Sequence, residues 1–264
     1  MQPPADAHPD ASSTPALKGI FRDARRDPTL AVLEGLHALK HALRFGAEVL
    51  SVAIAEPERV RELAEALAPD VLEWILADAH AVPPELFAAL APQAPSTGVI
   101  AIARRPRVEV EDLLADPRPA PIVLLERPRD LGNLGACVRV AAAADIAGVL
   151  STGVHDPWDP AALRGSAGLH YALPVARLGE DALPRLGVGR PLVGLDPDGE
   201  ELRSAELPDR AILAFGGERH GLSEELRTRA DVLVRLPMRE GVSSLNLATS
   251  VSAVLYCWRL GGVG

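Results

Sequence analysis

The sequence predicts an α/β protein in which a smaller unit precedes a larger one. In the larger unit, two near-continuous apolar runs, PIVLL at 121–125 and AILAF at 211–215, are typical of strands buried on both faces of a parallel sheet. Helical patterns alternate with strand-like runs, which favours an open sheet that binds ligands at the carboxyl ends of its strands. A proline-rich, mostly acidic stretch at 106–119 is interpreted as a linker between the two units.

The composition is that of an ordinary globular protein. Of the residues, 48% are hydrophobic and 24% are charged. The length of 264 residues is enough for one large or two small domains. No apolar run approaches the roughly 18 residues of a membrane span. Residues 1–15 lack the regions of a signal peptide, so we expect a disordered tail and a cytoplasmic protein without membrane contact. Cys137 and Cys257 have no metal-ligand spacing and predict free thiols and no metal site.

The smaller unit is expected over residues 16–105. Asp27 and Pro28 are typical of a helix N-cap and first helical residue, and apolar residues then recur with helical spacing from Val32 until Gly46 ends the helix. The remaining pattern predicts helices at 57–68 and 84–90 and strands at 49–55, 71–77 and 97–103. These elements form a compact α/β unit of the usual domain size.

The larger unit is expected over residues 120–264. Strands at 146–150, 191–195 and 232–236 join the two apolar runs, and a helix spans about 134–144. A last helix, at about 244–259, has an apolar face, and Ser244 is predicted as its cap.

Three polar loops in the larger unit hold the candidate functional residues. The first, DLGNLGACVR, lies between a strand and a helix, where backbone N–H groups are unpaired. Gly132 and Gly135 allow tight turning and close approach of the backbone, and Asn133 supplies a donor and an acceptor without charge. Arg139 lies six residues after Asn133, roughly 9 Å along the helix axis.

The second loop, FGGERHGLSEE, directly follows the AILAF strand. Its Gly216–Gly217 pair lets a ligand lie against the backbone, and Ser223 is predicted to cap the next helix. The third loop, LPMREGVSSLNLATS, is irregular and precedes the long apolar helix. Asn246 is a poor helix former near the start of that apolar segment, so its side chain needs a partner such as a ligand or a facing chain.

Each loop alone fits a plain strand-to-helix connection. In their order and spacing, however, the three loops resemble the motifs of the SpoU/TrmH family of RNA ribose methyltransferases, of the SPOUT class. The resemblance covers about residues 120–260 and is most specific in the third loop, where Leu-Pro-Met precedes Ser-Leu-Asn. The first 105 residues resemble, in layout and in the sequence from Leu36 to Leu39, the ribosomal-protein-like domain that often precedes the catalytic domain in this family.

The resemblance implies a trefoil-knotted catalytic domain, a homodimer with its active sites at the interface, and S-adenosylmethionine as methyl donor. Carried over by position, the donor-binding residues are Gly216, Leu236 and Leu245, and the residues at the reaction centre are Asn133, Arg139, Glu218, Ser244 and Asn246. One departure is Leu131, at a place where the family often has proline; the change concerns the rigidity of the loop more than its chemistry.

The implied reaction is attack of a ribose 2′-oxygen on the sulfonium methyl group. Because the donor is intrinsically reactive, the protein mainly has to position the two atoms and to help the hydroxyl lose its proton. The pKa of an arginine exceeds about 12, so Arg139 is a poor base and is expected to hold the adjacent phosphate. The identity of the general base stays open.

The net charge of −9 argues against bulk electrostatic binding of nucleic acid, so an RNA must be held by a local patch. Arginines cluster at both ends of the smaller unit and predict an RNA clamp made of Arg22, Arg25, Arg26, Arg104, Arg105 and Arg107.

Several alternatives remain open at this point. The two-unit layout favours ribosomal RNA over transfer RNA as substrate, and both remain candidates. A catalytically inactive RNA-binding or ribosome-assembly protein is the second hypothesis, disfavoured by the intact polar residues of the three loops. A nicotinamide-dependent enzyme is a third, but the first strand of the larger unit lacks a following G-x-G-x-x-G.

Overall fold

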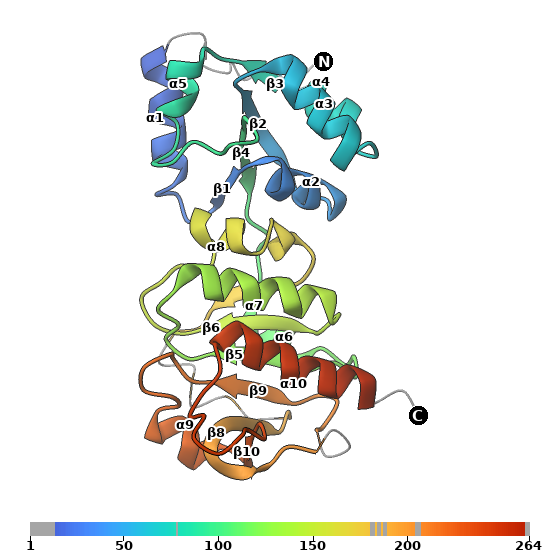
Figure 1. The fold of residues 1–264 in the computed structure, drawn as a ribbon, viewed down its shortest axis with the longest axis vertical. Coiled ribbons are helices and arrows are strands. Elements are labelled where there is room, and N and C mark those ends of the chain that lie inside the picture. Colours follow the sequence, from blue (N-terminus) through green and yellow to red (C-terminus); the bar gives the residue numbers. More distant parts are fainter. Residues whose placement is uncertain are drawn as a thin grey trace, which may run out of the picture.

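The computed structural model of this chain describes residues 14–77, 79–179, 183, 186, 189–203 and 207–261. Figure 1 shows two β-sheets that follow one another along the long axis of the molecule, with helix α8 (Pro160–Gly165) at the contact between them. The strand order is β1-β4-β2-β3 in the smaller sheet and β10-β8-β9-β5-β6-β7 in the larger one. The predicted disordered tail, residues 1–15, lies outside the described residues except for its last two positions, which begin α1.

The smaller sheet is mixed. Its strands are β1 (Leu30–Glu34), β2 (Val49–Ile54), β3 (Ala79–Ala81) and β4 (Val99–Arg104). Strands β1 and β2 both pair antiparallel with β4, and β3 pairs parallel with β2. The helices of this unit are α1 (Thr14–Ala24), α2 (Leu36–Arg44), α3 (Pro57–Leu67), α4 (Leu72–Ala77) and α5 (Pro84–Ala88).

Helices cover both faces of the smaller sheet, because successive residues of a strand point to opposite sides. Val32 and Ile100 pack in one core with α1 and α5, whereas Leu33 and Ala101 pack in the other with α2, α3 and α4. Figure 1 shows the two sets of helices on opposite sides of the strands.

Two predictions for this unit are wrong. The helix expected to begin at Asp27 is preceded by strand β1, and Asp27 instead accepts a hydrogen bond from the backbone N–H of Thr29 at 2.8 Å in a turn. The segment 71–77, expected as a strand, contains helix α4, and the strand follows it. In both places a short apolar run fits either type of element, and tertiary packing decides which one forms.

The larger sheet is entirely parallel in its pairings, as predicted. Its strands are β5 (Ile122–Leu125), β6 (Gly148–Ser151), β7 (Val175–Arg177), β8 (Leu192–Glu201), β9 (Ile212–Phe215) and β10 (Val232–Arg235). Its helices are α6 (Val110–Ala115), α7 (Leu131–Ala143), α8, α9 (Glu224–Arg229) and α10 (Leu247–Gly261), with the 3-10 turn η1 (Leu169–Tyr171). Helices α7 and α10 lie side by side on one face (Figure 1).

The order of the strands creates a switch point in the larger sheet. From β5 the chain proceeds outward to β6 and β7, and then returns on the other side of β5 through β8, β9 and β10. Ligands of open α/β sheets bind outside the carboxyl ends of the strands at such a point. The loops that follow β5 and β9, which are neighbouring strands, are therefore brought together.

Residues of the predicted linker contain α6 and pack against the larger sheet. Arg190 is only 1% exposed, and its guanidinium group donates hydrogen bonds to the backbone oxygens of Leu114, Asp116 and Ala120 at 2.9, 2.7 and 2.9 Å. A buried cation needs such partners, since an unpaired charge is costly away from water. These bonds fix the path of the chain as it enters β5.

The two units contact one another through polar and close backbone contacts. Glu34, at the end of β1, is buried and forms ion pairs with Arg25 at 3.1 Å and with Arg164 of α8 at 2.5 Å. Gly168 has a φ of +80°, and a Cβ atom there would overlap the backbone of Ala38. The contact therefore depends on a residue without a side chain at this position.

Cys137 and Cys257 are free thiols, as predicted, and burial raises the pKa of Cys137 to about 12. In the described part of the chain, the helices are too short or too polar to cross a membrane.

Candidate active site

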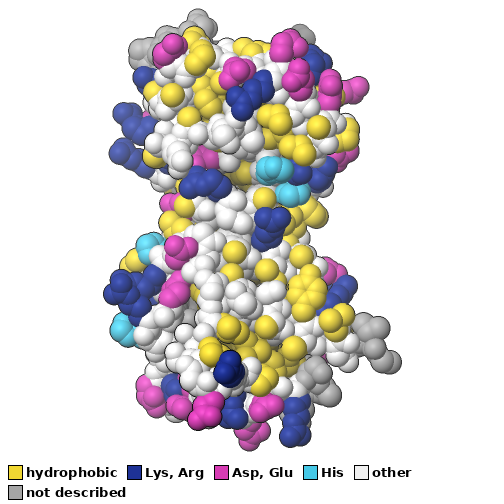
Figure 2. All heavy atoms as spheres, in the orientation of Figure 1, with side chains coloured by type: hydrophobic (Ala, Val, Ile, Leu, Met, Phe, Trp, Pro, Cys, Tyr) yellow, Lys and Arg dark blue, Asp and Glu magenta, His cyan; other side chains and the backbone are white. Residues whose placement is uncertain are grey.

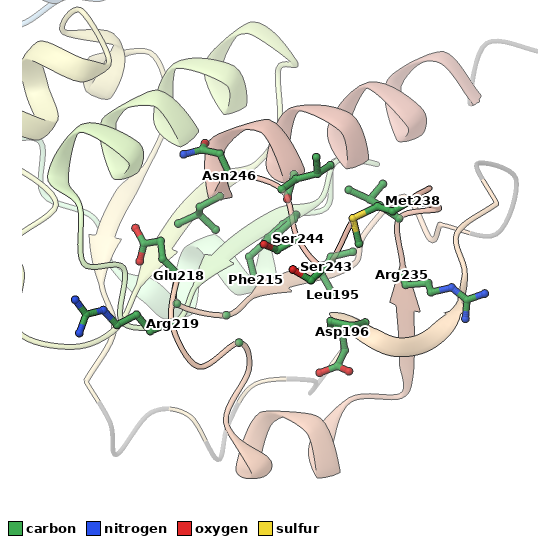
Figure 3. A pocket seen from close by; sticks show the side chains of 18 of the residues that line it. Leu195, Asp196, Phe215, Glu218, Arg219, Arg235, Met238, Ser243, Ser244 and Asn246 are labelled. Atoms are coloured by element: carbon green, nitrogen blue, oxygen red, sulfur yellow. The ribbon is translucent and has the colours of Figure 1, made fainter. Parts of the chain in front are cut away.

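A cavity of about 590 Å³ lies at the carboxyl ends of β9 and β10 and beside the middle of β8 (Figure 3). It is enclosed by these strands, by the loop after β9 and by the irregular chain between β10 and α10. Its apolar walls include Leu195, Phe215, Leu236 and Leu245. The volume lies within the range of about 300 to 1,000 Å³ that is usual for small-molecule sites.

A chain of hydrogen bonds joins the three polar loops at one end of this cavity. Asn133 of α7 donates from Nδ2 to Oε1 of Glu218 at 3.3 Å, and its Oδ1 accepts a hydrogen bond from Nδ2 of Asn246 at 3.0 Å. Figure 3 shows Glu218 and Asn246 at this end of the cavity and Met238 at the other. Three polar side chains that are far apart in the sequence thus meet beside one pocket.

Asn246 also caps the last helix. Its Oδ1 accepts hydrogen bonds from the backbone N–H groups of Ala248 at 2.9 Å and Thr249 at 3.3 Å. The prediction that Ser244 caps this helix is therefore wrong, because the helix begins three residues later and Ser244 lines the cavity. The prediction that Asn246 needs a partner is confirmed by these bonds and by the bond to Asn133.

The first loop is mostly helical. Asp130 is the N-cap of α7 and accepts a hydrogen bond from the backbone N–H of Asn133 at 2.7 Å. Gly135 lies inside α7, where a Cβ atom would overlap the backbone of Ala162 in α8. This glycine allows two helices to approach closely and does not face the cavity.

The second loop folds back on itself. Gly217 and Gly221 form an isolated β-bridge, with a hydrogen bond from the N–H of Gly221 to the oxygen of Gly217 at 3.0 Å. A Cβ atom on Gly216 would overlap the backbone of Gly221 and Leu222. Gly216 is thus needed for the shape of the loop, which in turn lines the cavity with backbone.

A buried carboxylate that the sequence reading missed holds the far end of this loop. Glu126, at the end of β5, is 3% exposed and accepts a hydrogen bond from the backbone N–H of Ser223 at 2.7 Å. Ser223 caps α9, as predicted, by accepting from the N–H of Leu226 at 3.3 Å. A charged residue that directly follows a buried apolar strand was the available signal for Glu126.

Glu218 connects the second loop to the first. Its two carboxylate oxygens accept hydrogen bonds from the backbone N–H groups of Arg129 at 3.0 Å and Asp130 at 3.3 Å, in addition to the amide of Asn133. Burial raises the pKa of Glu218, but the hydrogen bonds from Arg129, from its own backbone, from Asn133 and from Asp130 outweigh it and lower the pKa below the ordinary value. Glu218 is therefore ionised at neutral pH.

The cavity receives most of the predicted site residues. Those that line it are Gly216, Glu218, Leu236, Ser244, Leu245 and Asn246, and Asn133 is bonded to two of them. Arg139 does not line it. It is exposed on α7. The pKa of His37 in the smaller unit is lowered first by burial, then by the charge of Lys40 and then by the charge of Arg139.

Asp196 is a further residue of the cavity that the sequence analysis missed. It lies in β8, directly after Leu195, the last residue of that strand that pairs with β9. Asp196 is 4% exposed and forms an ion pair with Arg227 of α9. In Figure 3 its carboxylate points away from the cavity centre, so its backbone forms the wall.

Together, the parallel sheet with a switch point and the pocket at its carboxyl edge define an α/β protein of the nucleotide- and cofactor-binding type. Residues 120–256 match the SpoU rRNA Methylase family, and the chain belongs to that family.

Named relatives agree with this assignment. The chain is 33% identical over 201 residues to the 23S rRNA (uridine(2479)-2′-O)-methyltransferase of Streptomyces viridochromogenes, a match over 72% of this chain and 65% of that protein. It is 30% identical over 206 residues to a 23S rRNA (guanosine-2′-O-)-methyltransferase of Neisseria meningitidis, over 75% of this chain and 80% of that protein. The chain thus spans slightly less than two thirds of the Streptomyces relative.

Solved structures are similar over nearly the whole chain. The SpoU methyltransferase AviRb from Streptomyces viridochromogenes, in complex with AdoMet, superposes with a TM-score of 0.75 at 26% identity, over 94% of this chain and 97% of that one. An RNA 2′-O ribose methyltransferase superposes with a TM-score of 0.72 at 26% identity, over 97% of this chain and 98% of that one.

Proposed function

We propose that this protein transfers a methyl group from S-adenosylmethionine to a ribose 2′-hydroxyl of ribosomal RNA. The observation that carries the proposal is the hydrogen-bonded chain Glu218–Asn133–Asn246, which unites three loops beside one ligand-sized pocket. The names of the relatives from Streptomyces and Neisseria, both 23S rRNA 2′-O-methyltransferases, support ribosomal RNA as the substrate class.

The pocket fits S-adenosylmethionine in its chemistry. Its apolar walls suit an adenine ring. Within residues 236–245, all of which the structure describes, one backbone hydrogen bond joins the N–H of Val242 to the oxygen of Arg239. Most backbone N–H and C=O groups of this segment are therefore available to a ligand. Gly216, Leu236 and Leu245 are the proposed donor-binding residues. When bound, the donor supplies an electrophilic methyl group on a sulfonium ion.

Asn133, Asn246, Glu218 and Ser244 are the proposed residues of the reaction centre. The amide of Asn246 is fixed by the two N–H groups that it caps, and it fixes Asn133 in turn. Ser244 lies in the same wall and offers a hydroxyl. The fixed amide groups and the hydroxyl orient the ribose hydroxyl toward the methyl group, which is the main requirement of this reaction.

We propose that the protein is a homodimer and that Arg139 serves the reaction centre of the second copy. Helices α7 and α10 pack side by side and carry apolar residues that are not fully buried, namely Ala136, Val140, Ala253 and Tyr256, the last of which is 41% exposed. Arg139 is exposed on α7 and does not line the pocket of its own chain. We propose that a second copy of the chain docks on this face of α7 and α10. Arg139 then lies at the reaction centre of that copy, where it holds a phosphate of the substrate.

The trefoil knot implied by the family resemblance is retained as a proposal. After β10, at the edge of the sheet, the chain returns to α7, because Asn246 of the third loop is bonded to Asn133 of α7. On this path the third loop passes the second loop, which supports a chain that is threaded through a loop.

We propose that residues 16–105 form an RNA-binding domain, connected by residues 106–119 to the catalytic domain at 120–264, and that the protein acts in the cytoplasm on ribosomal RNA. The match of the family to residues 120–256 alone supports this division of labour.

The test combines donor binding with methyl transfer. Calorimetry is expected to detect binding of S-adenosylmethionine and no binding of NAD. With labelled donor, the protein is expected to transfer the labelled methyl group to a ribose of ribosomal RNA. Donor binding without transfer to any RNA would favour the inactive RNA-binding alternative, and transfer to transfer RNA alone would favour the second substrate class.

A further inference from the structure

The arginines that the sequence predicts as an RNA clamp are mostly used inside the protein. Arg25 pairs with buried Glu34 at 3.1 Å, Arg104 with Glu48 at 2.9 Å, and Arg105 with Asp156 at 2.7 Å. Arg22 likewise pairs with its neighbour Asp23 at 3.2 Å. Four of the six arginines of the predicted clamp therefore form ion pairs within the protein.

Two other arginines lie at the mouth of the reaction centre. Arg129 precedes the N-cap of α7, and its backbone N–H donates to Glu218 at 3.0 Å, while Arg219 directly follows Glu218. Both residues are exposed. Among the residues that the structure describes, neither guanidinium group has an ion-pair or hydrogen-bond partner.

The two carboxylates at this place, those of Glu218 and Asp130, are exposed and accept hydrogen bonds from the loop backbone and from an amide. Glu218 accepts hydrogen bonds from Arg129, Asp130 and Asn133, and Asp130 accepts from the N–H of Asn133. Backbone and amide donors therefore occupy both oxygens of Glu218 and one oxygen of Asp130, and neither carboxylate pairs with the guanidinium group of Arg129 or Arg219. In Figure 3 the Arg219 guanidinium points away from the cavity, although its residue borders it.

The loops that follow β5, β6 and β9 meet beside these two arginines. Gly217 lies against the backbone of Arg127, and Gly153 lies against that same residue. Figure 2 shows Lys or Arg side chains together with histidines and with Asp or Glu side chains on the left flank of the larger unit.

We infer that Arg129 and Arg219 form a two-point clamp for the RNA phosphodiester next to the target ribose. This inference rests on the proposed function. An arginine binds a phosphate through a planar, bidentate pair of donors, and two such groups on either side of Glu218 define both the position and the direction of a backbone segment. Because Glu218 is bonded to Asn133, a phosphate held here places its ribose beside the reaction centre.

The test compares Arg129→Ala, Arg219→Ala and the double variant with the full-length protein, using a 23S ribosomal RNA transcript as the probe. RNA affinity is expected to fall about tenfold for each change. The slope of log affinity against log salt, measured between about 50 and 200 mM, is expected to flatten by about 0.7 to 0.9 for each lost contact. Arg177→Ala, an exposed arginine at the end of β7 that does not line the cavity, is the matched control and is expected to leave both quantities unchanged.

Three readouts separate a clamp from a structural effect. S-adenosylmethionine affinity is expected to stay within about twofold, the KM for RNA to rise much more than kcat falls, and lysine at either position to restore the salt slope better than alanine. A double variant with the wild-type salt slope and KM would overturn the clamp while methyl transfer by the wild type upholds the proposed function. Equal losses of donor and RNA affinity would also overturn it. A wild type that neither binds nor methylates RNA would overturn both.

Discussion

Asn246 donates a hydrogen bond from Nδ2 to Oδ1 of Asn133 at 3.0 Å, across 113 positions of sequence. The oxygen of the same amide caps α10, so its two ends are committed to different partners and the side chain has one orientation. The bond joins α7, which contains most of the first loop, to the start of α10, which lies within the third loop. It makes the geometry of the proposed reaction centre dependent on the correct start of the last helix.

The two roles of Asn246 can be separated by substitution. Serine also caps helices well but lacks the second donor, so Asn246→Ser is expected to keep the stability of the fold and to lower methyl transfer about tenfold or more. Asn246→Ala is expected to lower transfer similarly and to reduce the free energy of unfolding by about 1 kcal/mol as well. Urea unfolding and single-turnover transfer measure the two effects. Wild-type transfer by Asn246→Ser would contradict the proposed role of the bond to Asn133.

The same chemical change at Gly216 and at Gly221 is expected to differ in the size of its effect and in its effect on donor binding. Gly216→Ala places a Cβ atom into the backbone of the folded loop, so we expect a loss of about 1 to 3 kcal/mol in stability together with weaker donor binding. Gly221→Ala has open space around its Cβ and only a positive φ of +64° to accommodate, so we expect a loss of about 1 kcal/mol. Calorimetry with S-adenosylmethionine and urea unfolding compare them. Equal effects of the two changes would show that crowding at Gly216 is unimportant.

Substitution of Glu34, at the contact between the units, is expected to lower the free energy of unfolding strongly. Glu34 is buried between Arg25 and Arg164, so Glu34→Gln leaves two guanidinium groups without their carboxylate and is expected to lower the free energy of unfolding by about 3 kcal/mol or more. Asp23→Asn removes an exposed pair with Arg22 and is the control, with an expected change below about 1 kcal/mol. Denaturant titration of both variants decides the matter, and a loss no larger than that of the control would refute the importance of the buried pair.

His170 predicts how stability depends on pH. It is fully buried between Ser166 and the backbone oxygen of Pro157, and burial, partly offset by the hydrogen bond to Pro157, lowers its pKa from 6.5 to about 4. Between these values the unfolded chain binds a proton that the folded chain does not. Stability from this group is thus fully present above about pH 6.5 and falls as the pH drops toward 4, by on the order of 3 kcal/mol.

The comparison for His170 is the pH dependence of unfolding in wild type and His170→Gln. The wild type is expected to lose more stability than the variant between about pH 6.5 and 4.5. The difference between the two slopes isolates this residue from the other titrating groups. Parallel slopes would mean that His170 is not held neutral by the fold.

The strands of the larger sheet were predictable because their burial on both faces produces uninterrupted apolar runs such as that from Ile122 to Leu125. The run from Leu30 to Glu34 is equally apolar, but helical spacing with Leu36 and Leu39 made it resemble part of the following helix. Local pattern cannot separate these cases, because the choice depends on pairing with β4, which lies almost 70 positions later.

The candidate site was predictable where a residue conflicts with its local context. Asn246 stands out because an amide is unfavourable in an apolar helical segment, and it has two kinds of partner. Arg139 lies on a helix, as expected, but its position on the outer face of α7 and away from the pocket depends on how the helices pack. Glu126 was missed because its partner, Ser223, is 97 positions away.

The most direct test of the central claim is transfer of a labelled methyl group from S-adenosylmethionine to ribosomal RNA, followed by alkaline hydrolysis. A 2′-O-methyl group blocks cleavage at the adjacent phosphodiester, so we expect one alkali-resistant position in the RNA treated with wild type and its absence after treatment with Asn246→Ser. Label found on a base, or a fully alkali-sensitive RNA after incubation with a donor-bound wild type, would contradict it.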